Sequence, residues 1–209
     1  MSLNLFKLDG RIALITGSGQ GIGLAMAEGL AAAGAHVVLN GRDKTKLEAA
    51  QGAIAAAGHK VSIAPFDVTD QKAVEAGVAA IEAEIGPIDI LINNAGTQKR
   101  GAFVDFPAED WHFLVATNLH SVFYVTQAVA KRMAPRNRGK IVSIGSVMSK
   151  LGRPTIVPYT ATKGAVVAMA RAMAVEFARH SISVNSVLPG WTRSGMTAGL
   201  QEWDKFTDA

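Results

Sequence analysis

Tyr159 and Lys163 are the two side chains of this sequence best suited by type and spacing to transfer a proton. Positions i and i+4 of a helix share a face, so the ammonium of Lys163 can lie beside the phenol of Tyr159. A free phenol has a pKa of about 10, and a nearby cation lowers that pKa, which suits a general acid/base working near neutral pH. The alternative is a solvated pair on an exposed helix face, because Tyr-x-x-x-Lys is a frequent coincidence.

A glycine-rich stretch near the N-terminus has the composition of a phosphate-binding loop. It follows a short apolar run, Ile12–Thr16, and precedes a helix-like run. Glycines let the backbone turn sharply and approach an anion, and the free N–H groups of a helix start add positive potential. The spacing is Gly17-x-x-x-Gly21-x-Gly23, not the general dinucleotide motif G-x-G-x-x-G. An ordinary strand-to-helix turn could have the same composition, so the loop needs support from the rest of the chain.

Short apolar runs alternate with longer helix-like runs along the whole chain. After Ile12–Thr16, we expect strands at Val37–Asn40, Val61–Phe66, Ile88–Ile92, Gly139–Ile144 and Ser183–Leu188. The expected helices include Lys44–Ala57 with Asp43 as N-cap, one after Thr69 or Asp70 that contains Val74–Ile85, Ala108–Met133 and Tyr159–Ala178. Such alternation predicts an α/β fold with a doubly wound parallel sheet and helices on both faces, because each right-handed crossover covers one face.

Ligands of such sheets bind beyond the carboxyl ends of the strands. The unusual residue groups of this chain all fall there: Gly17–Gly23, Arg42, Asp67, Asn93–Gly96, Ser146 and Pro189–Gly190. This coincidence favours a phosphate-binding loop over an ordinary turn.

Taken together, these motifs resemble those of the short-chain dehydrogenase/reductase family. They are the glycine loop, Asn93-Asn94-Ala95-Gly96, Asn118, Ser146 thirteen residues before Tyr159, Tyr159-x-x-x-Lys163 and Pro189-Gly190, in the family's order. The resemblance implies one Rossmann-type domain, residues 1–209, with three α/β/α layers and both the cofactor and catalytic sites. It also implies an oxidoreductase that moves a hydride between a nicotinamide cofactor and a secondary alcohol or ketone, with no metal.

The resemblance implies a role for each matching residue. Tyr159 would exchange a proton with the substrate oxygen, while Lys163 would lower the pKa of Tyr159 and bind the nicotinamide ribose. Ser146 would hold the substrate oxygen, and Asn118 would hold a water that links Lys163 to solvent. The cofactor would contact Gly17, Ser18, Gln20, Gly21, Ile22, Gly23, Arg42, Asp67, Val68, Asn94, Gly96, Tyr159, Lys163, Pro189, Gly190 and Ser194.

The end of the second expected strand indicates which cofactor is preferred. Gly41 stands where the family's NAD-selective members usually carry an acidic residue, and Arg42 follows it. A guanidinium matches a 2′-phosphate bidentately, so we expect NADP(H) to be preferred over NAD(H). Asp43 lies near the same place but fits better as a helix cap.

The substrate is expected to be an anion. Lys99 and Arg100 in one loop, and Lys150 and Arg153 in another, come to the same rim, with no acidic residue in either segment. The candidate substrate-binding residues are Gln98, Ser146, Arg153 and Tyr159. Short loops of this kind can also be merely solvated.

Three stretches are similar to the gluconate 5-dehydrogenases, which interconvert gluconate and 5-ketogluconate. They are Asn93–Arg100, Leu151–Pro154 and Lys163–Val166. The alternatives are 3-oxoacyl-carrier-protein reductase, whose partner is also acidic, and a non-catalytic nucleotide-binding scaffold.

The sequence departs from the family in two places. Ser194 stands where the family usually has Thr, and it keeps the hydroxyl. The sequence stops at Ala209, so the family's last helix and seventh strand are expected to be missing, which would leave Ser183–Leu188 as a bare edge.

Composition sets further limits. The 209 residues are 49% hydrophobic and 18% charged, which excludes a disordered chain, and the absence of Cys excludes disulfides and thiolate metal sites. No signal-peptide core or membrane-spanning stretch is evident, so we expect a soluble cytoplasmic protein. The net charge is +4, and the basic stretch Lys131–Lys140 fits a helix end better than a nucleic-acid interface.

The two longest expected helices, Ala108–Met133 and Tyr159–Ala178, are apolar on more than one side. Packing on the sheet accounts for one face of each. The resemblance implies that they pair across a twofold axis in a homo-oligomer, a tetramer in the family and a dimer if the seventh strand is absent.

Overall fold

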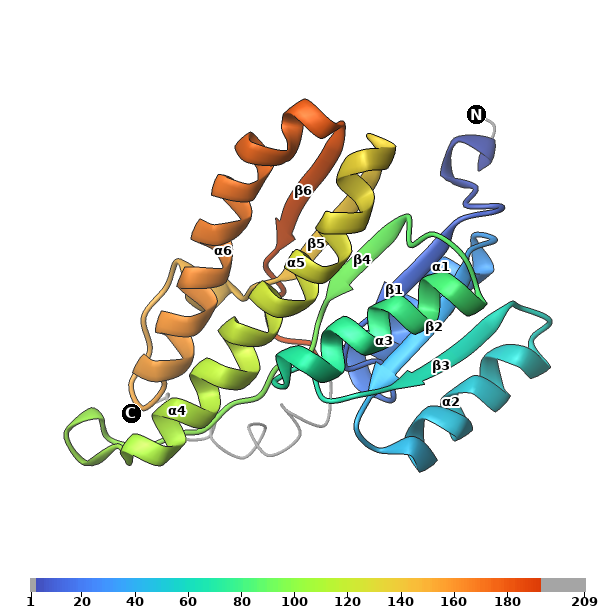
Figure 1. Cartoon of the computed structure of the whole chain (residues 1–209). Coiled ribbons are helices and arrows are strands. Elements are labelled where there is room, and N and C mark those ends of the chain that lie inside the picture. Colours follow the sequence, from blue (N-terminus) through green and yellow to red (C-terminus); the bar gives the residue numbers. More distant parts are fainter. Residues whose placement is uncertain (1–2, 193–209) are drawn as a thin grey trace.

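The structure, a computed structural model, describes residues 3–192. Its centre is a six-stranded parallel sheet in the order β3-β2-β1-β4-β5-β6 (Figure 1). The strands are β1 (Ile12–Ile15), β2 (His36–Gly41), β3 (Val61–Pro65), β4 (Ile90–Asn93), β5 (Gly139–Ile144) and β6 (Ile182–Val187). The predicted strands are confirmed, with ends that differ by at most two residues.

Helices cover both faces of the sheet, which confirms the doubly wound three-layer architecture. One face carries α1 (Gly21–Ala32) and α2 (Lys44–Ala56), which pack on Ala13, Ile15, Val37 and Leu39. The other face, on the near side in Figure 1, carries α3 (Gln71–Glu84), α4 (Ala108–Val115), α5 (Ser121–Met133) and α6 (Val157–Phe177). Leu14 and Val38 alternate with the first set along their strands and pack against α3 and α5, so both sheet faces are buried.

Two aspartates fix the starts of the helices that follow β2 and β3. Asp43 caps α2 by accepting a hydrogen bond from the Lys46 N–H at 3.1 Å. Asp70, not Thr69, caps α3, because its carboxylate accepts from the N–H groups of Lys72 and Ala73. The interpretation of Asp43 as a cap is therefore confirmed.

The long helix expected at Ala108–Met133 is interrupted. Ala116–His120 forms a π-turn between α4 and α5, with Asn118 at its centre. By its length and mean hydropathy (1.2), the run Ala108–Arg136 could cross a membrane, although no membrane-spanning stretch was expected from the sequence. Half of its most apolar window is buried, and α5 packs on α3 and on the sheet, so it is a core helix of this fold.

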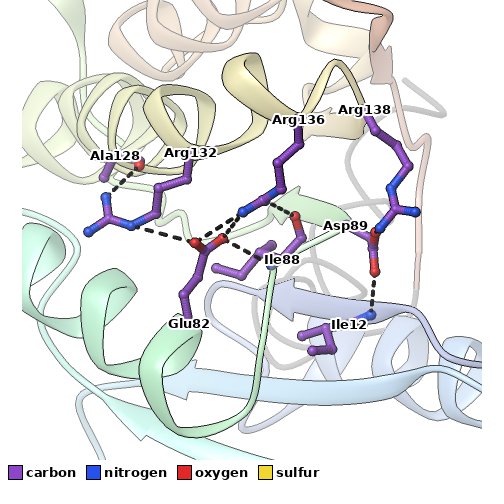
Figure 2. Close-up of polar contacts among 8 residues, drawn as sticks. All are labelled: Ile12, Glu82, Ile88, Asp89, Ala128, Arg132, Arg136 and Arg138. Atoms are coloured by element: carbon purple, nitrogen blue, oxygen red, sulfur yellow. Dashed lines mark hydrogen bonds and ion pairs between the residues drawn. The ribbon is translucent and has the colours of Figure 1, made fainter.

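Two carboxylates at the amino ends of the strands pair with the basic stretch Lys131–Lys140 (Figure 2). Glu82 accepts from Arg136 at 3.0 Å and from the Ile88 N–H at 3.0 Å, and it lies 3.7 Å from Arg132. Asp89 accepts from the Ile12 N–H at 3.1 Å and pairs with Arg138 at 2.6 Å. Three of the stretch's cations therefore serve packing of α3, α5 and the sheet, which supports the helix-end interpretation.

The order of the strands places the crevice for ligands. The chain runs outward from β1 to β3 and then returns to β4 beside β1, so the switch point lies between the carboxyl ends of β1 and β4. Within residues 3–192, β6 pairs with β5 alone, and Val187 is half exposed.

We predict that Glu82→Ala lowers the free energy of unfolding by about 2–3 kcal/mol, because two arginines and the Ile88 N–H lose their acceptor. Denaturant titration measures the difference. The control is Glu84→Ala on the exposed side of the same helix, which should change stability by less than about 0.5 kcal/mol. Equal losses in the two variants would contradict the prediction.

Candidate active site

A cavity of about 510 Å³ lies along the carboxyl ends of β1, β2, β3 and β4. It is lined by most of the predicted cofactor residues: Gly17, Gln20, Gly21, Ile22, Gly23, Arg42, Asp67, Val68, Asn94 and Gly96. Sequence reasoning missed Asn40, Lys46, Phe66, Thr69, Thr97, Phe113 and Thr117, which also line it. They lie at the carboxyl ends of β2, β3 and β4, on α2 and α4 and in the π-turn, and none belongs to a distinctive motif.

The glycine loop lies at one end of this cavity and fits a pyrophosphate. Gly17 and Gly21 adopt positive φ angles of 64° and 61°, which favour glycine. A Cβ on Gly17 would lie 2.9 Å from Ala95 Cα, and one on Gly23 would collide with the Gly17 carbonyl. Gln20, the N-cap of α1, makes no side-chain hydrogen bond to the first turn, so the N–H groups there are free to bind an anion.

Ser18, which was expected to contact the cofactor, does not line this cavity. Its side chain is fully buried, donates to the Ile15 carbonyl at 2.8 Å and accepts from the Asn40 N–H at 3.0 Å. It therefore braces the loop against β2. The direction of the Ser18 side chain depends on tertiary packing, which the motif alone does not predict.

The far end of the cavity carries opposite charges. Arg42 lies 3.7 Å from Asp67, and its side chain is 67% exposed, so it can turn toward a ligand. Burial by itself would raise the pKa of Asp67, but hydrogen bonds from Thr69 and the charge of Arg42 outweigh it and lower the pKa. Asp67 thus stays ionised as a hydrogen-bond acceptor at neutral pH.

Ser146, Tyr159 and Lys163 come together where β5 meets α6. Ser146 follows β5 and caps a short 3₁₀ turn, and its hydroxyl is hydrogen-bonded to Tyr159. Lys163 is one turn along α6 from Tyr159, with Nζ 6.0 Å from the centre of the phenol ring. Its Nζ donates to the Ile144 carbonyl at 2.7 Å and is 3.4 Å from the position of a Cβ on Gly96. Glycine at position 96 therefore leaves room beside the ammonium.

Burial dominates the protonation of this group. It raises the pKa of Tyr159, and the hydrogen bond with Ser146 only partly opposes that rise. It lowers the pKa of Lys163 to about 8. The expectation that Lys163 lowers the Tyr159 pKa is thus not met in net direction, because desolvation of the phenol is the larger effect.

Asn118 is fully buried at the π-turn and bridges the loop after β4 to α6. Its Oδ1 accepts from the Thr97 N–H at 2.8 Å, and its Nδ2 donates to the Thr97 carbonyl and to Thr162 Oγ1. The side chain holds the loop in register with the catalytic helix. Its role in holding a water stays a prediction.

A second cavity, of about 80 Å³, lies beside Ser146 and Tyr159. The predicted residues Gln98, Ser146, Arg153 and Tyr159 line it, together with Arg100, Val147, Met148, Ile156, Gly190 and Trp191. The sequence analysis did not predict Trp191, although an aromatic residue directly after Pro189-Gly190 was a usable signal. The Arg153 guanidinium lies 4.9 Å from the centre of the Trp191 ring. Gly190 lines this cavity and not the larger one, and Ser194 lies outside the described residues.

Of the four cations expected at the rim, two line this cavity. Arg100 and Arg153 line it together, and burial and then the charge of Arg153 lower the pKa of Arg100. Lys150 is exposed and lines neither cavity. Lys99 turns away and pairs with Asp110 on α4 at 3.0 Å, which corrects the expectation that it belongs to the rim.

The two loops that carry Arg100 and Arg153 are joined by their backbones. The Gly101 N–H donates to the Thr155 carbonyl at 3.1 Å. Thr155 has a φ of 68°, which is rare for a β-branched residue and marks local strain. Proline-rich and charged loop sequence gave no sign of this link.

We predict that Lys163 makes stability rise with pH above about 8. The unfolded chain holds this proton up to the ordinary pKa of 10.5, whereas the folded protein releases it at about 8, so the unfolded state binds more protons between these values. Lys163→Met should remove a slope of up to about 1.4 kcal/mol per pH unit from denaturant titrations between about pH 8 and 9.5. Lys72→Met, on the exposed start of α3, should keep the wild-type slope. Parallel slopes for wild type and Lys163→Met would contradict the buried cation.

Comparison with known proteins agrees with this geometry. The family model described as short chain dehydrogenase matches residues 11–205. Gluconate 5-dehydrogenase of Gluconobacter oxydans (strain 621H) is 54% identical over 98% of this chain and 80% of its own length. 5-Keto-D-gluconate 5-reductase of Escherichia coli (strain K12) is 45% identical, with 98% and 80% covered. A crystal structure of a gluconate 5-dehydrogenase from Burkholderia cenocepacia J2315, in complex with NADP and tartrate, superposes with a TM-score of 0.95 at 45% identity, covering 100% of this chain and 82% of that one.

The comparisons therefore confirm the family predicted from the motifs, the glycine-loop cavity and the Ser146–Tyr159–Lys163 group. The chain belongs to the short-chain dehydrogenase family and is an oxidoreductase that acts on CH–OH groups.

Proposed function

We propose that this enzyme interconverts gluconate and 5-ketogluconate with NADP(H). The choice of substrate rests on the pair Arg100 and Arg153, which line one cavity with Ser146 and Tyr159. Within residues 3–192, no Asp or Glu forms an ion pair with either arginine. Two uncompensated guanidiniums suit a carboxylate, and the Gln98 amide suits a hydroxyl group. The sugar-acid relatives support this choice.

The catalytic group would work through proton transfer and orientation. NADPH, when bound, supplies the hydride for reduction of the ketone. The Ser146 hydroxyl holds the substrate oxygen against Tyr159, whose phenol donates its proton to that oxygen as the C–H bond forms. The raised pKa of Tyr159 keeps the phenol protonated at neutral pH, which suits the direction of reduction. The Lys163 ammonium then stabilises the phenolate that remains.

The cavity fits NADP(H) by the chemistry of its lining. Gly17, Gly21 and Gly23 would hold the pyrophosphate, and Val68 and the ionised Asp67 would contact the adenine. Arg42 and Lys46 would face a 2′-phosphate. Asp43, the first acidic residue after β2, is occupied as the cap of α2, which supports a preference for NADP(H) over NAD(H).

Arg42→Ala should weaken NADPH binding by roughly 1.5–3 kcal/mol, the scale of a hydrogen bond to a charged group, and should change NADH binding little. Fluorescence titration of each cofactor measures both. Lys44→Ala is the matched control, because Lys44 is paired with Glu48 and does not line the cavity. A loss of equal size for the two cofactors would count against the preference, and would instead reflect the broken contact with Asp67.

The substrate is tested by comparing NADPH-dependent reduction of 5-ketogluconate with reduction of an acetoacetyl thioester, the substrate type of the runner-up, 3-oxoacyl-carrier-protein reductase. We expect turnover of 5-ketogluconate, and a KM raised about 10- to 100-fold in Arg153→Ala, because a charge-assisted hydrogen bond is lost. Lys150→Ala, an exposed cation of the same loop, should leave KM unchanged.

Other outcomes separate the remaining functions. Turnover of the thioester alone would overturn the sugar-acid proposal, and a KM indifferent to Arg153 would overturn its anion site. Tyr159→Phe should lower kcat by about 10² or more with NADPH affinity unchanged. Wild type that binds NADPH but reduces neither substrate would favour a non-catalytic scaffold.

We also infer a homo-oligomer in the cytoplasm, with a dimer through α5 and α6. Phe123 on α5 is 48% exposed and Val175 on α6 is 80% exposed, so both helices present apolar side chains away from the sheet. Sedimentation velocity at micromolar concentration should give twice the monomer mass or a multiple of it, and Phe123→Asp should shift the population toward monomer. A wild-type monomer would contradict the inference.

A further inference from the structure

The loop between β4 and α4 turns three neighbouring side chains in two directions. Gln98 and Arg100 line the cavity beside Tyr159, whereas Lys99 between them does not. Lys99 Nζ lies 3.0 Å from Asp110 Oδ1 and 5.9 Å from the centre of the Phe113 ring, both on α4. Because Lys99 lies between Gln98 and Arg100 in the chain, holding its side chain on α4 restricts the directions that its two neighbours can take.

Backbone hydrogen bonds hold the two ends of this loop, whereas its middle is held by the side chain of Lys99. The Thr97 backbone is bound twice by Asn118, and the Gly101 N–H donates to the Thr155 carbonyl at 3.1 Å. Among the backbone hydrogen bonds of residues 3–192, none is made by the N–H groups of Gln98, Lys99 or Arg100. The ion pair with Asp110 is therefore the contact that can set the rotation of the loop between its ends.

Arg100 needs such a restraint because its neighbour repels it. Burial is the larger effect that disfavours the charged form of Arg100 and lowers its pKa, and the charge of Arg153 adds to it. A flexible Arg100 would swing toward solvent, and substrate binding would then include the entropy of ordering it. An anchored backbone keeps the guanidinium in place before the substrate arrives.

We propose that Asp110 and Lys99 form a positioning pair that holds Gln98 and Arg100 at the substrate cavity, with neither member touching the substrate. The inference rests on the proposed anionic substrate of the same cavity. The pair is partly exposed, with side-chain exposures of 46% for Lys99 and 28% for Asp110, so its contribution to global stability is small. Its effect is expected in substrate binding.

The test uses Asp110→Asn, Lys99→Met and the double variant. Asparagine keeps the shape of Asp110 without its charge, and methionine keeps an unbranched chain without the ammonium that lies over Phe113. We expect KM for 5-ketogluconate to rise about 5- to 20-fold in each single variant, with kcat changed less than about twofold and NADPH affinity unchanged. The double variant should be no worse than either single one, because the two residues act as one unit.

The matched control is Lys44→Met with Glu48→Gln, an exposed ion pair of 3.6 Å on α2, which should leave KM unchanged. Equal KM values in wild type and the Asp110 variant overturn the positioning role. If the two single variants raise KM by different factors, and the double variant raises it by the product of those factors, the pairing is overturned. A general structural defect would instead lower kcat and NADPH affinity together.

A second readout does not depend on the substrate. Deuterium exchange at the Gly101 amide, bound to Thr155, should quicken at least about fivefold in Asp110→Asn, because the loop loses its middle anchor. Unchanged exchange overturns the proposal. If wild type does not reduce 5-ketogluconate, the proposed substrate fails while this exchange measurement still decides the positioning role.

Discussion

The junction between β1 and β4 is the constraint on which both cavities depend. Thr16 Oγ1 accepts from the N–H groups of Asn94 and Ala95 at 3.0 Å, and Asn94 Nδ2 donates back to the carbonyls of Thr16 and Gly17. These bonds replace the sheet ladder at the switch point, where the two strands separate. They hold the glycine loop against Ala95 on one side and start the loop to Gly101 on the other. The glycine loop and the loop to Gly101 thus diverge from one hydrogen-bonded point.

Burial of Lys163 links the fold to the chemistry. The residue is 5% exposed and its ammonium donates to the Ile144 carbonyl at the end of β5, so the central sheet itself positions the cation. An ammonium in this place destabilises the folded protein when protonated, which its lowered pKa of about 8 expresses. The same desolvation strengthens its attraction to any phenolate formed on Tyr159. The site therefore accepts a cost in stability that becomes useful only when charge develops next to the cation.

Sequence patterns predicted the fold and most of the site because both follow from local rules. Alternating strand and helix runs require a parallel sheet, and the sheet gathers residues such as Arg42, Asp67 and Ser146 at one edge without further information. Directions of individual side chains do not follow from such rules. Ser18 points inward and Lys99 points to α4 because of partners 22 and 11 positions away. The raised pKa of Tyr159 likewise depends on burial, which the i+4 spacing of Lys163 does not reveal.

The cavity lined by Arg100 and Arg153 illustrates how unfavourable contacts can indicate a function. Arg100 beside Arg153, and Thr155 at a positive φ, each oppose the observed arrangement of the two loops. Backbone hydrogen bonds at Thr97 and Gly101, the stacking of Arg153 on Trp191 and the anchoring of Lys99 hold that arrangement against them. An anion placed between the guanidiniums would turn the repulsion into attraction without moving either loop. A carboxylate there would relieve the like charge next to the hydroxyl groups of Ser146 and Tyr159, whereas the strain at Thr155 stays balanced by the backbone hydrogen bond to Gly101.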